Sequence, residues 1–237
     1  MKIRRYLIPF SITLLIACGL SFTHTSAKQG NANSFTLDQV LSSPFSSELV
    51  GSPKGDRVAW VFNVQGKRNI WGAEGPSFKA HRLTSNKDDD GIEISSLVFS
   101  HDGKWIVFVR GGEENAAGEV PNPTSNPAGA RQEVFAVSFD DGRLIHLADG
   151  NSPVVSPVGN RIVYSKDSQI WTVEIADGSE PHQLFAARGN NGSPVWSPDG
   201  RRLAFTSNRG DHSLIGIYDV EKNTLKYAAP SVDRDSH

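Results

Sequence analysis

A short turn segment recurs four times, and it constrains the fold of this chain more than any other feature. The four copies are Ser52-Pro53-Lys54-Gly55, Ser100-His101-Asp102-Gly103, Ser156-Pro157-Val158-Gly159 and Ser197-Pro198-Asp199-Gly200. Proline fixes φ at the first central position, aspartate accepts local backbone hydrogen bonds, and glycine adopts a positive φ without a steric clash. Each copy is therefore predicted to join two strands. The third copy has Val158 where two others have aspartate, and it is predicted to lose the hydrogen bond of the turn.

An apolar strand pattern follows each turn at constant spacing. Counted from the serine, position six is aliphatic, position seven apolar and position eight aromatic in all four copies. These residues are Val58, Ala59 and Trp60; Ile106, Val107 and Phe108; Ile162, Val163 and Tyr164; and Leu203, Ala204 and Phe205. A strand that is apolar on both faces is buried on both faces, as in sheets that stack on neighbouring sheets.

Two further strands are predicted in each copy. The third strands centre on Ile70-Trp71, Val134-Phe135, Ile170-Trp171 and Ile217-Tyr218, and the fourth on Arg82-Leu83-Thr84, Leu144–Leu147, Gln183-Leu184-Phe185 and Leu225-Lys226-Tyr227. Four strands in a unit of roughly 40–50 residues are typical of a propeller blade. We therefore predict an all-β fold, a β-propeller with about four four-stranded blades in an incomplete ring. The blades are predicted at residues 48–84, 97–148, 151–187 and 192–229 of a propeller at 48–230. The alternative, a β-sandwich, would not keep this register over four units.

The repeats resemble those of known families. The four turns with their apolar-aromatic strands are similar to TolB-like propeller repeats. The strings LVGSPKGDRVAWVFN (49–63), RNIWGAE (68–74) and SPVWSPDGRRLAFTSNRGDHSLIGIYD (193–219) resemble the amino-terminal propeller of the prolyl oligopeptidase family of serine peptidases, especially its secreted dipeptidyl- and acylaminoacyl-peptidase-like members. The resemblance covers the chain from about Phe35 onward. It implies a non-catalytic propeller that caps a catalytic domain and restricts access to short peptides.

The first 27 residues are predicted to be a signal peptide. Lys2, Arg4 and Arg5 form a basic segment, Leu7–Leu20 is apolar, and Thr25-Ser26-Ala27 offers small residues for cleavage. A transmembrane helix is the weaker alternative because of Pro9 and the modest apolar length. Cys18, the only cysteine, follows Leu15-Ile16-Ala17 as in a bacterial lipoprotein signal, and it is therefore a candidate for lipidation. The chain is predicted to be exported, periplasmic or extracellular. Cleavage after Ala27 is favoured over a lipid anchor on Cys18, and only that anchor would contact the membrane. Residues 28–47 are predicted to be a lead-in.

Charge and motifs exclude several functions. The chain has 24 basic and 26 acidic residues, and its first 27 residues hold three of the basic ones, which leaves 21 against 26 for the remainder. This negative balance, without a basic stripe, predicts no nucleic-acid partner. Phosphate-binding and dinucleotide motifs are absent, and the seven histidines lack zinc-ligand spacing, so no cofactor and no metal site are predicted. The resemblance to peptidase and TolB-like propellers implies a peptide substrate or a protein partner.

Two connecting segments are irregular. Residues 85–91 contain Asp88, Asp89 and Asp90, for which a solvated acidic loop is favoured over a calcium loop because the ligands do not alternate. The long segment Gly111–Gln132 is rich in Gly, Pro, Asn and Ala and is predicted to be a loop. Loops of this length in compact domains are usually functional or disordered. Glu113 and Glu114 stand in a glycine-rich setting, unlike the helical acidic pair of dipeptidyl peptidases, and are predicted to lie on the surface.

The sequence predicts no catalytic residue. A Gly-x-Ser-x-Gly nucleophile elbow is absent, so the serine-peptidase chemistry of the family would require a catalytic domain that this chain lacks. Residues 231–237 are predicted to be the truncated start of a further blade. The outer face of the fourth unit is expected to expose residues of the runs Leu203–Phe205 and Leu214–Tyr218. Two functions stay open: the propeller portion of a secreted peptidase, and a stand-alone TolB-like scaffold that binds a protein partner in the cell envelope.

Overall fold

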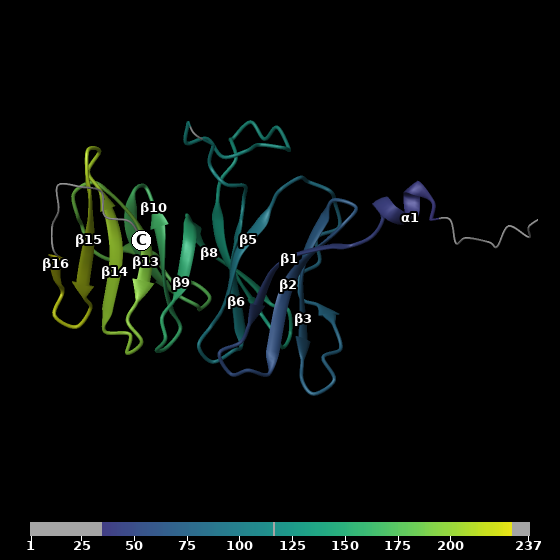
Figure 1. Cartoon of the computed structure of the whole chain (residues 1–237), viewed down its shortest axis with the longest axis horizontal. Coiled ribbons are helices and arrows are strands. Elements are labelled where there is room, and N and C mark those ends of the chain that lie inside the picture. Colours follow the sequence, from purple (N-terminus) through teal and green to yellow (C-terminus); the bar gives the residue numbers. More distant parts are fainter. Residues whose placement is uncertain (1–34, 116, 229–237) are drawn as a thin grey trace, which may run out of the picture. The chain divides into compact units, whose positions relative to one another are not determined.

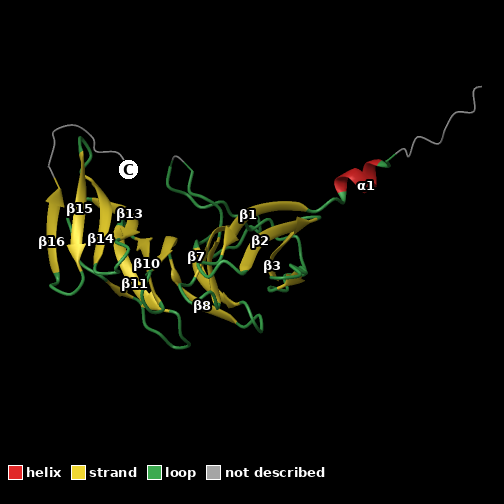
Figure 2. Ribbon diagram, turned by 60° about the horizontal axis from the view of Figure 1, so that its bottom comes forward, coloured by secondary structure: helices red, strands yellow, loops and turns green. Residues whose placement is uncertain are grey.

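The computed structural model describes residues 35–115 and 117–228, and these form four antiparallel sheets of four strands each (Figures 1 and 2). A short helix, α1 (Leu37–Leu41), precedes them. Blade one contains β1 (Phe45–Gly51), β2 (Arg57–Val64), β3 (Lys67–Glu74) and β4 (His81–Arg82), and blade two β5 (Ile94–Phe99), β6 (Trp105–Arg110), β7 (Glu133–Ser138) and β8 (Leu144–Asp149). Blade three contains β9 (Asn151–Val155), β10 (Arg161–Lys166), β11 (Gln169–Glu174) and β12 (His182–Gln183), and blade four β13 (Asn190–Trp196), β14 (Arg202–Asn208), β15 (Ser213–Asp219) and β16 (Thr224–Ala228).

Each sheet is a simple meander, because its strands pair in the order in which they occur in the chain. This arrangement confirms the prediction of an all-β propeller built from four-stranded blades, and the four sheets do not close into a ring over the described residues. The fourth strands of blades one and three have only two residues each. In both blades the next residue still donates its backbone N–H to the third strand, from Leu83 to the Ile70 carbonyl at 2.8 Å and from Leu184 to the Ile170 carbonyl at 3.0 Å.

The first strand of every blade contains a β-bulge. A non-glycine residue with positive φ lies at the bulge in each case: Glu48, Ser96, Ser152 and Ser193. The strand pairing shifts register at the same places. The extra residue breaks the period-two alternation on which sequence patterns depend. Blades one, two and four begin at residues 45, 94 and 190, two or three residues before the expected starts at 48, 97 and 192, whereas blade three begins at the expected residue 151.

The four repeated turns use two hydrogen-bonding patterns. In the turns that contain aspartate, Asp102 and Asp199 each accept a hydrogen bond from the serine hydroxyl at 2.6 Å and one from a backbone N–H two residues later. In the third turn, Val158 donates its own backbone N–H to the Oγ of Ser156 at 3.2 Å. The aspartate bond is therefore missing in blade three, as predicted, but the serine hydroxyl supplies a different one.

The hydrophobic core consists of three clusters, one between each pair of consecutive sheets. Ile70 of blade one packs in a cluster with Phe108 of blade two, Val134 of blade two with Tyr164 of blade three, and Ile170 of blade three with Phe205 of blade four. The residue at position seven after the turn serine faces the following blade, and the aromatic residue at position eight faces the preceding blade. Each fully buried aromatic side chain contributes about 1.5–3 kcal/mol relative to its exposed state. The stacking of blades thus accounts for strands that are apolar on both faces.

Candidate functional site

The long loop Gly111–Gln132 between β6 and β7 is the largest departure from the repeat and builds the candidate site. Asparagine side chains shape it: the Oδ1 of Asn115 accepts backbone N–H groups of Ala117 and Glu119 at 2.9 and 3.0 Å. The Oδ1 of Asn122 accepts the N–H of Asn126 at 2.9 Å. Such side-chain-to-backbone bonds replace the backbone ladder that the segment lacks. The described part of the loop therefore has a defined course without regular secondary structure.

The loop lies against the segment that connects blades one and two. A Cβ atom on Gly91 would come within 2.7 Å of the Pro123 ring, so only glycine leaves room for this contact. The Arg110 guanidinium forms an ion pair with Asp90, and the backbone N–H of Gly111 donates to the Glu93 carbonyl at 2.9 Å. These contacts hold the start of the loop and Pro123 in its middle close to the acidic link that precedes β5.

A cavity of about 330 Å³ lies under the loop. It is lined by Ile92, Arg110, Gly111, Pro121, Asn122, Pro123, Thr124, Asn126, Ala128, Gly129, Ala130, Arg131 and Glu133. The lining is mostly small, neutral and rich in backbone polar groups, and it also includes two arginines and one glutamate. Such a surface suits a short peptide, whose own backbone can exchange hydrogen bonds with loop backbone and asparagine groups.

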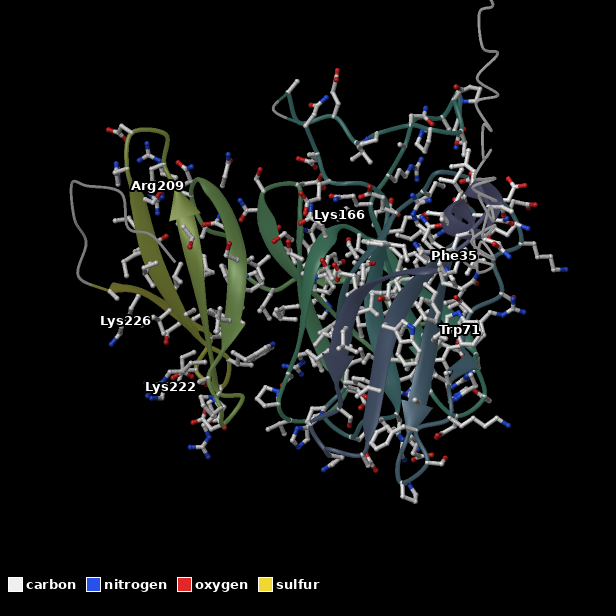
Figure 3. All side chains as sticks on the ribbon, turned by 45° about the vertical axis from the view of Figure 1, so that its right-hand side comes forward. Phe35, Trp71, Lys166, Arg209, Lys222 and Lys226 are labelled. Atoms are coloured by element: carbon white, nitrogen blue, oxygen red, sulfur yellow. The ribbon has the colours of Figure 1, made fainter. Side chains whose placement is uncertain are left out.

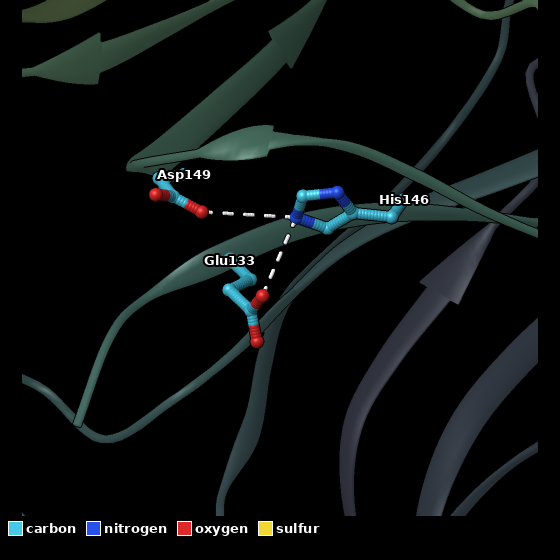
Figure 4. Close-up of side chains that lie close together, drawn as sticks. All are labelled: Glu133, His146 and Asp149. Carbon is cyan, nitrogen blue, oxygen red and sulfur yellow. Dashed lines mark ion pairs between the residues drawn. The ribbon is translucent and has the colours of Figure 1, made fainter. Parts of the chain in front are cut away.

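Glu133 also belongs to a cluster with His146 and Asp149 beside the cavity (Figure 4). The Nε2 of His146 lies 3.4 Å from the Oε1 of Glu133 and 3.8 Å from the Oδ1 of Asp149. Strand pairing brings them together, because Glu133 of β7 is opposite Asp149 of β8 and Phe135 is opposite His146. The His146 ring packs edge-on against Phe135 with centroids 5.0 Å apart.

Among the described residues, these three side chains bring one imidazole and two carboxylates close enough together to hold a metal ion. One imidazole and two carboxylates match the donor types of a three-ligand zinc or manganese site. A cation would compete with Arg131, whose Nη1 is 3.5 Å from the Oδ2 of Asp149. The four side chains form a network of ion pairs when His146 is protonated.

Tyr164 is buried next to this network. Gly150, which follows Asp149, leaves space for the Tyr164 ring, since a Cβ there would come within 2.6 Å of it. Burial of the ring, together with the negative charge of Asp149, raises the pKa of Tyr164 to about 12. Its hydroxyl has no hydrogen-bond partner among the described residues. The side chain is therefore neutral at physiological pH and acts in packing.

The acidic features that stood out in the sequence do not converge. Asp90 pairs with Arg110, whereas the Asp89 carboxylate lies against Gly66 in the turn between β2 and β3. Glu113 and Glu114 are exposed on the long loop. Neither the aspartates of residues 85–91 nor the glutamate pair forms a cluster of metal ligands among the described residues. Cys18, the candidate lipidation residue, lies outside the described residues.

The cluster of Glu133, His146 and Asp149 was not predicted from the sequence. These residues are too far apart in the chain for a ligand motif, and only the pairing of β7 with β8 brings them together. The cluster could have been predicted from the strands at Val134-Phe135 and Leu144–Leu147, because an antiparallel hairpin there puts Glu133 and His146 close to each other.

In the part of the chain that the structure describes, no helix is long and apolar enough to cross a membrane.

Sequence comparison gives one short match to a curated protein. No protein-family model matches the chain. The Tol-Pal system protein TolB of Thioalkalivibrio sulfidiphilus is 48% identical over 46 residues, which are 19% of this chain and 11% of that protein. The match thus extends over little more than one blade.

Structural comparison covers most of the chain at low identity. TolB from Acinetobacter baumannii matches with a TM-score of 0.53 and 17% identity, over 79% of this chain and 44% of that one. Porphyromonas gingivalis dipeptidyl peptidase 4 gives 0.56 and 12% over 78% and 33%, and Pyrococcus horikoshii acylaminoacyl peptidase gives 0.52 and 17% over 77% and 31%. The chain spans less than half the length of these proteins. It has the β-propeller fold that occurs in TolB and in peptidases of the prolyl oligopeptidase family.

Proposed function

We propose that this chain is the non-catalytic propeller portion of a secreted serine peptidase of the prolyl oligopeptidase family, and that it restricts substrate access to a catalytic domain absent from this chain. The observation that carries the proposal is the cavity of about 330 Å³ under the loop Gly111–Gln132, at a place where the other blades have short turns. The shared fold with dipeptidyl and acylaminoacyl peptidases supports the same assignment.

The mechanism is selection by size and by backbone recognition. The loop cavity admits an extended peptide of a few residues, and its walls of Asn, Gly and Pro present polar backbone groups to it. Arg131, with a side chain that is 62% exposed, is placed to attract a peptide carboxylate at the edge of the cavity. A folded protein is too large for such a cavity and is excluded. Hydrolysis itself requires residues outside this chain.

Peptide binding to the loop cavity is the direct test. We expect unblocked tetra-alanine to bind saturably in isothermal titration calorimetry. Affinity should fall at least tenfold in Arg131→Gln, and binding should disappear when residues 113–130 are replaced by a short Gly-Ser turn. The matched control is the double variant Glu113→Gln with Glu114→Gln, since neither residue lines the cavity. Absence of binding to the unaltered protein at millimolar peptide, or equal binding to the loop-deleted variant, would refute the proposal.

A TolB-like scaffold that binds a protein partner in the cell envelope is the second candidate. The 46-residue match at 48% identity to TolB favours it. The genomic sequence on the 3′ side of the His237 codon separates the two candidates. A continuing frame with a Gly-x-Ser-x-Gly motif and later Asp and His codons supports the peptidase. A stop codon followed by a separate promoter supports the scaffold, for which tetra-alanine should not bind.

Both candidates require export, which we propose from the sequence of the first 27 residues. Cleavage after Ala27 would leave a mature protein that begins at Lys28, whereas lipidation would leave an acylated Cys18 at the amino terminus. Mass spectrometry of the protein purified from the expressing cells distinguishes these forms. A protein that retains Met1 and stays in the cytoplasm would contradict export by either route.

A further inference from the structure

Three side chains of blade two converge beside its last strand. Glu133 of β7 and His146 and Asp149 of β8 offer ligand atoms that all lie within 4.8 Å of one another. Both carboxylates approach the same atom, the Nε2 of His146 (Figure 4). The side chains of Glu133, His146 and Asp149 are 34%, 49% and 39% exposed, so an ion can reach all three from solvent.

The separations within this cluster fit the ligands of a small cation better than they fit hydrogen bonds. The Nε2 of His146 lies 3.4 Å from the Oε1 of Glu133 and 3.8 Å from the Oδ1 of Asp149. Hydrogen bonds from a nitrogen to an oxygen are roughly 2.7–3.2 Å long. Ligands that bind zinc at about 2.0–2.1 Å in a tetrahedron lie about 3.3 Å from one another, and a shift of the partly exposed Asp149 carboxylate by roughly 0.5 Å brings both contacts close to this value.

A β-bulge directs the imidazole toward the carboxylates. In the pairing of β7 with β8, Glu133 lies opposite Asp149. The register then shifts, so that Phe135 lies opposite His146. Residues three apart on a regular strand point to opposite faces of the sheet, but this shift puts His146 and Asp149 on the same face. Phe135 packs against the ring edge-on, with centroids 5.0 Å apart. The bulge thus brings one nitrogen ligand to two oxygen ligands.

The Glu133 carboxylate has no permanent positive partner. It lies opposite Asp149, and like charges opposite each other on adjacent strands are destabilising. Arg110, which lies opposite Glu133 on β6, forms its ion pair with Asp90 instead. Among the described residues the ion-pair contact of Glu133 is therefore the His146 imidazole, which carries a charge only when it is protonated.

Two other basic side chains nearby leave the negative charge of the cluster incompletely balanced. The Nη1 of Arg131 lies 3.5 Å from the Oδ2 of Asp149, so the Oδ1 that faces His146 stays available to an ion. Lys166 of the next blade, labelled in Figure 3, has its Nζ 5.2 Å from the centroid of the Trp171 ring. When His146 is neutral, the two carboxylates therefore carry one more negative charge than Arg131 balances. A divalent cation would reverse this excess.

We propose that Glu133, His146 and Asp149 bind a zinc ion through Oε1, Nε2 and Oδ1 respectively. Imidazole nitrogen and carboxylate oxygen are zinc donors, and three protein ligands leave a fourth position for water. Zinc stands above manganese in the affinity order of sites with nitrogen and oxygen ligands. Calcium takes about six to eight oxygen ligands, which a site with one imidazole and two carboxylates does not supply. The zinc site does not depend on peptide binding under the loop.

Calorimetric titration of the untagged, chelator-treated full chain with zinc chloride tests the site. We expect one zinc ion per chain with a micromolar Kd, and His146→Ala, Glu133→Gln and Asp149→Asn should each weaken binding at least tenfold. His212→Ala is the matched control, since His212 has a single carboxylate partner, Asp211, with Nδ1 and Oδ1 2.8 Å apart. Its zinc affinity should equal that of the unaltered protein. Equal affinity in His146→Ala, or displacement of zinc by millimolar calcium, would show a solvated acidic surface and refute the site.

Two further measurements separate a zinc site from a loss of folding. Arg131→Gln removes a positive charge beside Asp149 and should raise the zinc affinity by up to about fivefold, the scale of an exposed ion pair. Cobalt(II) in place of zinc reports the coordination geometry, because four-coordinate cobalt absorbs visible light far more strongly than the hydrated ion. We expect the strong absorption in the unaltered protein and in Arg131→Gln, but not in His146→Ala. Weaker zinc binding by Arg131→Gln, or strong absorption that persists in His146→Ala, would contradict the assignment.

Discussion

Two tyrosines with similar burial have different hydrogen bonding, which gives a prediction at the residue scale. The Tyr164 hydroxyl has no partner among the described residues, whereas the Tyr218 hydroxyl donates to Asn223 Oδ1 at 2.8 Å. An unpaired buried hydroxyl costs free energy, and a paired one contributes about 1 kcal/mol. We expect Tyr164→Phe to leave the free energy of unfolding unchanged or to raise it by up to about 1 kcal/mol. Tyr218→Phe should lower it by about 1 kcal/mol. Urea denaturation measures both, and the reverse order would contradict the assignment.

The aspartates of the repeated turns predict a pH dependence. Partial burial of Asp102 raises its pKa, but the hydrogen bonds from Ser100 and from the Lys104 backbone outweigh this effect, so the pKa is lowered overall. A carboxylate with a lowered pKa stabilises the fold above its unfolded value of about 4, and this contribution is lost as pH falls through its folded pKa. Asp102→Asn should therefore lower the free energy of unfolding at pH 7 by at most about 1 kcal/mol, because the site is partly screened by solvent. The difference from the unaltered protein should shrink as pH falls below about 4 and vanish once Asp102 is protonated in the folded protein. A difference that persists there would count against the charge effect.

At the scale of elements, the loop Gly111–Gln132 differs in exposure at its two ends. Arg110 is 28% exposed in its side chain and paired with Asp90, whereas Arg131 is 62% exposed. Exposed loop segments are the preferred sites of proteolysis. We expect the first tryptic cut after Arg131, and Arg131→Gln should delay it. First cuts after Arg57 or Arg161, which lie in strands of the blades, would contradict the fold.

The elements that follow a local rule could be predicted from the sequence. The turn at Gly200 and the second strand after it have a fixed spacing in all four units, so strand number and order followed from pattern alone. The starts of the first strands could not be predicted, since the bulges at Glu48, Ser96 and Ser193 interrupt alternation without a glycine to mark them. The candidate site depends on pairing between residues such as Glu133 and Asp149, which a motif search along the chain does not detect.

At the scale of the whole molecule, stability depends on contacts between consecutive sheets. Each blade is a meander with local pairing, but its apolar faces are buried only by its neighbours. Arg57 adds a polar connection between blades one and two: it donates to the Gly103 carbonyl at 3.1 Å and pairs with Asp140 at 2.9 Å. Its guanidinium also lies 4.4 Å from the Phe139 ring centroid.

A double-mutant cycle at Gly72 and Phe139 tests this stacking most directly. Gly72→Ala crowds the Phe139 ring and should cost about 1–3 kcal/mol in the free energy of unfolding, and Phe139→Ile should leave space and also destabilise. Together the two substitutions reproduce the Ala136 and Ile175 pair of the next interface. We predict that the double variant, measured by urea denaturation, is more stable than the sum of the single effects by at least about 1 kcal/mol. Additive effects would show that blades one and two do not stack as described.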